Sequence, residues 1–169
     1  MRFSLATGAS TTVGSVAWAK DTTWSGSTGA QVYLQAPDRD PAADGNQGWD
    51  LSGYLSSGGV LAFDAKVNGA PAAAVKTRID CGYPCMGELD ATALFTDATL
   101  GDGNAHTFKI PLSCFQSAGT DFAKINTPFL LSTAGAFELT FADVRWLPGD
   151  HAGTGVATCS AGVLSPPAP

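Results

Sequence analysis

Charged side chains are scarce in this sequence. They make up 14% of its 169 residues, against roughly a quarter in an average globular domain. Basic residues are the scarcer kind, with 9 Lys and Arg against 15 Asp and Glu and a formal net charge of −6. Nucleic acids and anionic membrane surfaces are bound through basic patches. We therefore expect neither of them as a partner.

Long apolar runs are also missing. No segment approaches the roughly 20 apolar residues that span a bilayer, and residues 1–8 lack the apolar stretch of a signal peptide. The length predicts one domain, and a hydrophobic content of 44% is enough to fill its core.

Residues that support catalysis are few. His106 and His151 are the only histidines, Glu88 and Glu138 the only glutamates, and no G-x-S-x-G motif occurs. Two carboxylates could hydrolyse a glycosidic bond, but nothing in the sequence indicates that any two acidic residues face each other across a cleft. We therefore do not expect an enzyme.

Four cysteines allow three disulfide pairings or a metal site. The Cys81-x-x-x-Cys85 spacing suits zinc, but Cys114 and Cys159 stand far apart with no histidine near either. A Ser/Thr/Gly-rich chain with little charge fits an oxidising compartment better. We favour a Cys81–Cys85 disulfide that closes a short local loop and a Cys114–Cys159 disulfide that closes a long one. The chain is then expected to be an excised module or a mature fragment of an exported protein.

Alternation with a period of two dominates the chain and predicts strands. Residues 60–67 place Leu61, Phe63, Ala65 and Val67 inside, and residues 74–81 alternate in the same way. The expected strands cover 30–36, 60–67, 74–81, 106–112, 129–133 and 136–146. A helical turn fits 91–95, and 115–122 is predicted as a loop with one more turn at most.

Short strands separated by turn residues predict an all-β sandwich of the jelly-roll kind. We expect residues 1–147 to form this domain. From Pro148 the chain turns to Gly, Ala, Ser and Pro with little periodicity. We therefore predict residues 148–169 to be a tail or linker tethered through Cys159.

The polar face of three predicted strands suggests a binding surface. Aromatic rings stack on the apolar face of a sugar while polar side chains bind its hydroxyl groups. If the three strands are neighbours, they present such a platform, formed by Tyr33, Gln35, Asp64, Lys66, Arg78 and Asp80. Trp49 and Trp146 are the tryptophans expected to be exposed, with core packing as the competing interpretation. A solvated sheet face with cross-strand charge pairs is the alternative for the platform.

An acidic loop offers oxygen ligands. Residues 38–46 (Asp-Arg-Asp-Pro-Ala-Ala-Asp-Gly-Asn) suit calcium by composition but lack the EF-hand spacing. A structural calcium ion could bind to this loop. Asp143, near the last predicted strand, is a second candidate ligand and has no stronger support than the loop. No other cofactor is expected.

A series of motifs, in order along residues 18–146, resembles a known family. The most distinctive are Cys81-Gly-Tyr-Pro-Cys85 and Leu112-Ser-Cys-Phe115. The others are Trp24-Ser-Gly, Asp50-Leu-Ser-Gly-Tyr54, Gly119-Thr-Asp-Phe122, Thr127-Pro-Phe129 and Asp143-Val-Arg145. Together they resemble the C-terminal domain of bacterial family 3 glycoside hydrolases, the exo-1,4-β-glucosidases and glucan glucohydrolases. The sequence departs from this family in its tail and in Trp146, where an aliphatic residue is more usual.

The resemblance implies a galactose-binding-like β-sandwich, similar to carbohydrate-binding modules, with the catalytic residues in other domains. We therefore expect a non-catalytic module that binds β-glucan or a related polysaccharide and targets an attached glycoside hydrolase, in a secreted, periplasmic or cell-surface bacterial protein. The alternative is a structural accessory domain that packs on the catalytic domain and binds no sugar.

Overall fold

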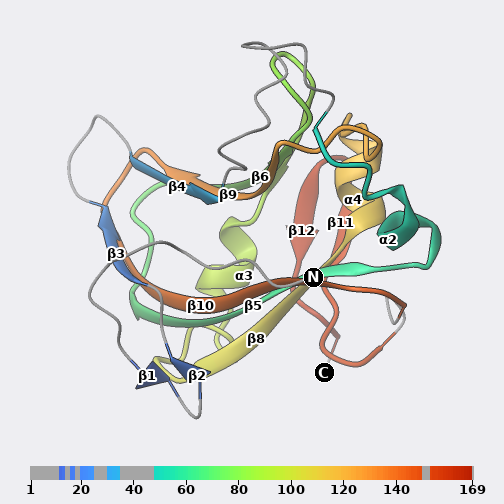
Figure 1. The fold of residues 1–169 in the computed structure, drawn as a ribbon. Helices are drawn as coiled ribbons and strands as arrows, with labels where there is room; N and C mark the ends of the chain where they lie inside the picture. The colour runs from blue at the N-terminus through green and yellow to red at the C-terminus, as the bar shows by residue number, and fades with distance from the viewer. Residues whose placement is uncertain are drawn as a thin grey trace.

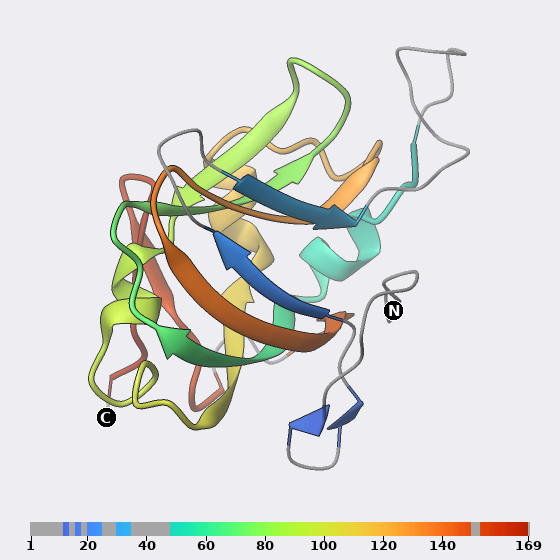
Figure 2. The ribbon, with the colours of Figure 1, turned by 90° about the vertical axis from the view of Figure 1, so that its left-hand side faces the viewer.

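Two β-sheets form the layers of a sandwich, as Figures 1 and 2 show. The computed structural model describes residues 12–13, 16–17, 20–24, 30–34, 48–149 and 153–168, with side chains from residue 31 onward. The four-stranded sheet has the order β3-β10-β5-β8, with β3 Lys20–Trp24, β10 Phe137–Leu147, β5 Val60–Gly69 and β8 Ala105–Pro111. The all-β sandwich expected from the alternation is confirmed.

The second sheet has six strands in the order β11-β12-β7-β6-β9-β4. These are β11 Thr158–Ser160, β12 Val163–Ser165, β7 Met86–Asp90, β6 Val75–Asp80, β9 Thr127–Thr133 and β4 Ala30–Leu34. β1 (Thr12–Val13) and β2 (Val16–Ala17) pair separately. The short helices are α2 Ser52–Ser56, α3 Thr92–Thr96 and α4 Leu112–Ser117. No helix in the described part is long and apolar enough to cross a membrane.

The core lies between the two sheets and follows the predicted alternation. Every residue expected to point inward from 60–67 and 74–81 is buried. Aromatic rings link the layers: Phe63 of the four-stranded sheet lies 5.3 Å from Phe108 of the same sheet and 5.4 Å from Phe129 of the six-stranded sheet, measured between ring centroids. These contacts hold the sheets face to face, so their outer faces point in opposite directions.

β10 reverses its alternation halfway along. Phe141 points into the core, and the pairing with β5 shifts register between Ala142 and Arg145. An extra residue exchanges the two faces of a strand, so Arg145 points outward and Trp146 inward. Trp146 is 0% exposed, and its Nε1 donates a hydrogen bond to the carbonyl oxygen of Pro128 at 3.2 Å. The prediction of Trp146 as an exposed sugar-binding ring is therefore wrong.

The C-terminal segment is part of the sandwich. β11 and β12 form a hairpin, and β12 runs parallel to β7. Leu164 is fully buried, while Val156 packs on the outer face of β5. The predicted tail from residue 148 is therefore wrong for 156–165, because strands of three residues are too short to show periodicity.

Both favoured disulfides are present. Cys81 joins Cys85, with their Cα atoms 5.0 Å apart, and Cys114 joins Cys159 across 6.0 Å. The second bond ties α4 to β11. It fastens the C-terminal hairpin to the body of the domain.

The strand β7 is absent from the prediction, because Gly87 interrupts its apolar pattern. The glycine is required by packing against α4 and the turn after it. A Cβ atom at position 87 would lie 2.3 Å from both the carbonyl oxygen of Phe115 and Oγ1 of Thr120. This close approach brings β7 under α4.

Candidate functional site

The expected six-residue platform is divided between the two sheets. Tyr33 and Arg78 lie on β4 and β6 of the six-stranded sheet, whereas Asp64 and Lys66 lie on β5 of the other sheet. Since the outer faces point in opposite directions, one continuous surface is impossible, and that prediction is wrong. Gln35 lies outside the described residues.

A row of side chains crosses the outer face of the six-stranded sheet. The pairing registers place Tyr33 opposite Leu130, Leu130 opposite Arg78, and Arg78 opposite Glu88. Opposite residues on neighbouring strands have side chains in contact range. Leu130 is 2% exposed although it faces away from the core. The row therefore has an apolar floor between an aromatic ring and a guanidinium group.

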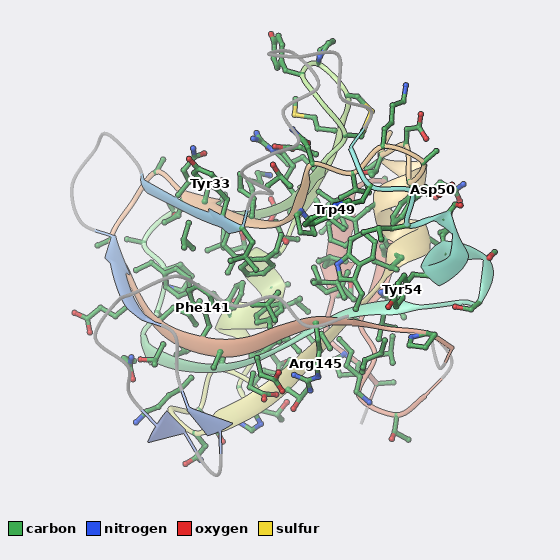
Figure 3. The ribbon with its side chains drawn as sticks, in the orientation of Figure 1. Tyr33, Trp49, Asp50, Tyr54, Phe141 and Arg145 are labelled. Carbon is green, nitrogen blue, oxygen red and sulfur yellow. A yellow bond between two sulfur atoms is a disulfide. The ribbon has the colours of Figure 1, made fainter. Side chains whose placement is uncertain are left out.

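A pocket of about 370 Å³ opens above this floor. Its lining is Gln31, Tyr33, Arg78, Asp80, Tyr83, Pro84, Cys85, Met86, Asn126, Thr127 and Leu130. The pocket thus brings together Tyr33, Arg78 and Asp80 from the expected platform. Tyr33 is 46% exposed and lies on the outer side of β4, as Figure 3 shows.

Tyr83 is the main residue of the pocket that the sequence interpretation did not select. It lies in the loop closed by Cys81 and Cys85, and it is 89% exposed. The amide of Cys85 donates to the carbonyl oxygen of Gly82 at 2.7 Å, and the Tyr83–Pro84 peptide is cis. The Cys-Gly-Tyr-Pro-Cys motif could have pointed to Tyr83, since a five-residue disulfide loop has no interior in which to bury a large ring.

The charged groups at the pocket compensate one another. Arg78 forms an ion pair with Asp80, with 2.6 Å between Nε and Oδ1, and its Nη2 donates to Oδ2 at 3.1 Å. Glu88 lies 3.9 Å from Nη1 of Arg78. Asp80 is the only carboxylate among the described residues that line the pocket. The described lining therefore offers hydrogen-bonding groups and an apolar surface.

A second ion pair lies on the same face, outside the pocket. Lys76 Nζ lies 2.8 Å from Oδ2 of Asp90, whose Oδ1 accepts hydrogen bonds from the amide and hydroxyl of Thr92. Burial raises the pKa of Asp90, but the hydrogen bonds from Lys76 and Thr92 outweigh burial and lower it to about 2. This pair links β6, β7 and the start of α3.

Trp49 is half-buried and does not line the pocket. Its amide and carbonyl exchange hydrogen bonds of 2.9 Å with Ile125, and its side chain packs against the core. Figure 3 shows Trp49 away from Tyr33, beside the Asp50–Tyr54 segment. The structure therefore does not bring the two selected tryptophans to the pocket.

The outer face of the four-stranded sheet holds an ion cluster. Nη1 of Arg145 lies 3.0 Å from Oδ2 of Asp143 and 3.6 Å from Oδ2 of Asp64. Thr107 donates to Oδ1 of Asp64 at 2.6 Å. Asp143 has a φ of 49°, which accompanies the register shift in β10. Lys66 is half-buried on this face.

Metal ligands are not gathered in the described part of the chain, where no three His, Cys, Asp or Glu residues are placed to hold an ion. Asp143 faces the guanidinium of Arg145 instead. The acidic loop 38–46 lies outside the described residues, so structural calcium there stays a prediction.

Comparison with known proteins agrees with this architecture. The sequence profile of the Exop_C family, described as galactose-binding domain-like, matches residues 18–146. Among curated protein sequences, none matches the chain.

Several solved structures share the fold. One is the extra C-terminal domain of the exo-1,3/1,4-β-glucanase ExoP from a Pseudoalteromonas species, with 19% identity, a TM-score of 0.58, and coverage of 84% of this chain and 70% of that domain. The whole ExoP enzyme matches with 16% identity and a TM-score of 0.56, over 87% of this chain but 15% of the enzyme. A family 30 carbohydrate-binding module matches with 18% identity and a TM-score of 0.62, over 83% of this chain and 71% of the module.

Proposed function

Because this chain belongs to the galactose-binding domain-like Exop_C family, we propose that it is a non-catalytic carbohydrate-binding module. Its ligand is β-glucan or a related polysaccharide, bound in the pocket on the outer face of the six-stranded sheet. By holding an attached glycoside hydrolase near its polymer, the module raises the local concentration of substrate.

One observation supports this proposal above the others. The described part of the chain has four exposed large hydrophobic side chains, Tyr33, Tyr83, Met86 and Val163, and the first three line this single pocket. A sheet face that is merely solvated has no reason to gather exposed rings around a buried leucine. Rings beside an apolar floor suit a ligand with an apolar face.

A pyranose has such a face and a rim of hydroxyl groups. Its C–H face can stack on Tyr33 or Tyr83. Its hydroxyl groups can bond to Arg78, Asp80 and Asn126, which supply donors and acceptors. The volume of about 370 Å³ lies in the usual range for small-ligand sites. We expect modest affinity, because the hydroxyl groups must be desolvated over a small contact area.

The role of the pocket is binding rather than hydrolysis. Glycosidases use two carboxylates that flank the scissile bond, and Asp80 is already paired with Arg78. Two disulfides suit an oxidising compartment. We therefore propose that the module belongs to a secreted, periplasmic or cell-surface bacterial protein.

Affinity electrophoresis tests the proposal, in gels that contain barley β-glucan, laminarin, xyloglucan, xylan or hydroxyethylcellulose. We expect retardation in at least one β-glucan gel, and loss of most of it in Tyr33→Ala. Lys66→Ala is the matched control, since Lys66 is a polar outer-face residue of the other sheet. Normal migration of the native protein in every gel would overturn the proposal and favour an accessory domain that binds no sugar.

A further inference from the structure

The loop of residues 81–85 is fixed at its base and open at its tip. The amide of Cys81 donates to the carbonyl oxygen of Cys85 at 2.9 Å, beside the disulfide that joins them. The amide of Gly82 donates to Oδ1 of Asn126 at 3.0 Å, and Sγ of Cys81 accepts from the amide of Asp121 at 3.1 Å. Cys81 itself is 3% exposed. The base of the loop is therefore attached to the body of the domain on two sides.

The ring at the tip has little packing of its own. Tyr83 is 89% exposed, so side-chain contacts cannot account for its position. It nevertheless lines the pocket together with Pro84 and Cys85. The location of the ring must then be set by the backbone of the loop.

The two disulfides differ in what they close. Cys114–Cys159 spans 45 residues, whereas Cys81–Cys85 spans 4. The entropy removed from the unfolded chain grows with the length of the closed loop. The short bond is therefore the weaker global cross-link, and its main effect is local.

We propose that the Cys81–Cys85 disulfide is a positioning element of the binding site, which holds the Tyr83 ring over the pocket. This inference rests on the proposed function of that pocket. A ring held in place before binding loses less conformational freedom when a sugar stacks on it. The disulfide thus acts on affinity through the position of Tyr83.

A double-mutant cycle tests this coupling. Affinity for the polysaccharide that retards the native protein is measured for Cys81→Ser/Cys85→Ser, for Tyr83→Ala and for the triple variant. Serine keeps an acceptor for the Asp121 amide. We expect each of the first two to bind about 10-fold more weakly, and the triple variant to bind no more weakly than Tyr83→Ala. Additive losses, or full affinity without the disulfide, would overturn the proposal.

Cys114→Ser/Cys159→Ser is the matched control. It should lower the melting temperature more than the Cys81/Cys85 pair does, because its loop is longer, while its affinity stays within about twofold of the native value. An equal loss of affinity in this control would show that any disulfide loss loosens the pocket, and would overturn the specific role of Cys81–Cys85.

Backbone ¹⁵N relaxation at Gly82 and Tyr83 gives a reading that needs no ligand. We expect ordered amides in the native protein and increased picosecond–nanosecond motion in Cys81→Ser/Cys85→Ser, with the strand amides unchanged. Unchanged order in the loop would overturn the positioning role. A protein that binds no polysaccharide but shows this loop behaviour would overturn the proposed function and leave the structural role of the disulfide supported.

Discussion

The two outer faces of the sandwich arise from the same alternating pattern but differ in what they leave open. On the six-stranded sheet, Arg78 and Asp80 form their ion pair at the edge of a pocket, with Tyr33 and Tyr83 exposed beside them. On the four-stranded sheet, Arg145 lies between two aspartates, and all three side chains are at most 15% exposed.

The difference shows that outward-facing charges do not by themselves mark a binding site. The cluster around Arg145 pairs opposite charges and is largely covered, and it lies at the register shift of β10. Farther along this face, Val156 packs on Val60 and Ala62. Access to solvent and exposed rings set the pocket apart from the opposite face.

Arg145→Ala should have the largest effect, and it should lower stability without changing glycan affinity. It leaves Asp64 and Asp143 without their cation in a partly buried cluster, and we expect the free energy of unfolding to fall by about 2–4 kcal/mol. Urea denaturation measures the loss. Glycan affinity under native conditions should stay unchanged. An unaltered urea midpoint would mean that this cluster is as solvated as an ordinary surface pair.

Arg78→Ala should show the reverse behaviour. Loss of a charged donor at the pocket should weaken polysaccharide binding roughly 10- to 30-fold, or about 1.5–2 kcal/mol, with a smaller cost in stability because the pair is more exposed. Isothermal titration calorimetry measures the affinity. Lys76→Ala is the control, as it breaks an ion pair on the same strand and face outside the pocket. Equal losses in both variants would contradict the assignment of the site.

Acid should act on the six-stranded sheet through Asp90, without involving the pocket. Its pKa is lowered from 3.8 to about 2 in the folded protein, so its contribution is complete above pH 4 and is lost as the pH falls toward 2. After allowance for solvent screening, the contribution is ~1 kcal/mol. The difference in stability between the native protein and Asp90→Asn, followed by urea titrations from pH 6 to 2, should shrink over that range. A constant difference would contradict the assigned pKa.

Thr107→Val should have the smallest effect. It removes the hydrogen bond to Asp64 from an exposed position on β8, which should cost about 0.5 kcal/mol. Thermal unfolding and affinity electrophoresis together check it. Any loss of retardation would show that the four-stranded face takes part in binding.

Much of the fold could be predicted from local pattern. Leu61, Phe63 and Ala65 are buried as their spacing requires, and both disulfides pair as favoured. The strands that escaped prediction are short or interrupted: β1 and β2 have two residues each, β11 and β12 have three, β3 has five, and β7 contains Gly87. A period of two cannot be recognised in so few positions.

The candidate site was predictable only in part, since Tyr33, Arg78 and Asp80 lie at the pocket while Asp64 and Lys66 do not. The alternating pattern predicts which side chains share a face of one strand, because the pleat is a local property of the backbone. The pattern does not predict which strands are neighbours in a sheet. The insertion of β9 between β4 and β6, and the placement of β5 in the other sheet, depend on long-range pairing.

Trp146 and Tyr83 show the same difference between local pattern and long-range contacts. The composition of residues 136–146 is enough to predict a strand, but a register shift relative to β5 buries Trp146 and turns Arg145 outward. The motif Cys81-Gly-Tyr-Pro-Cys85 is enough to predict a tight loop, but the folded sheet brings Tyr83 into the lining of the same pocket as Tyr33 and Leu130. Local chemistry dictates each element and its buried face, whereas contacts between residues far apart in the chain dictate which exposed side chains meet.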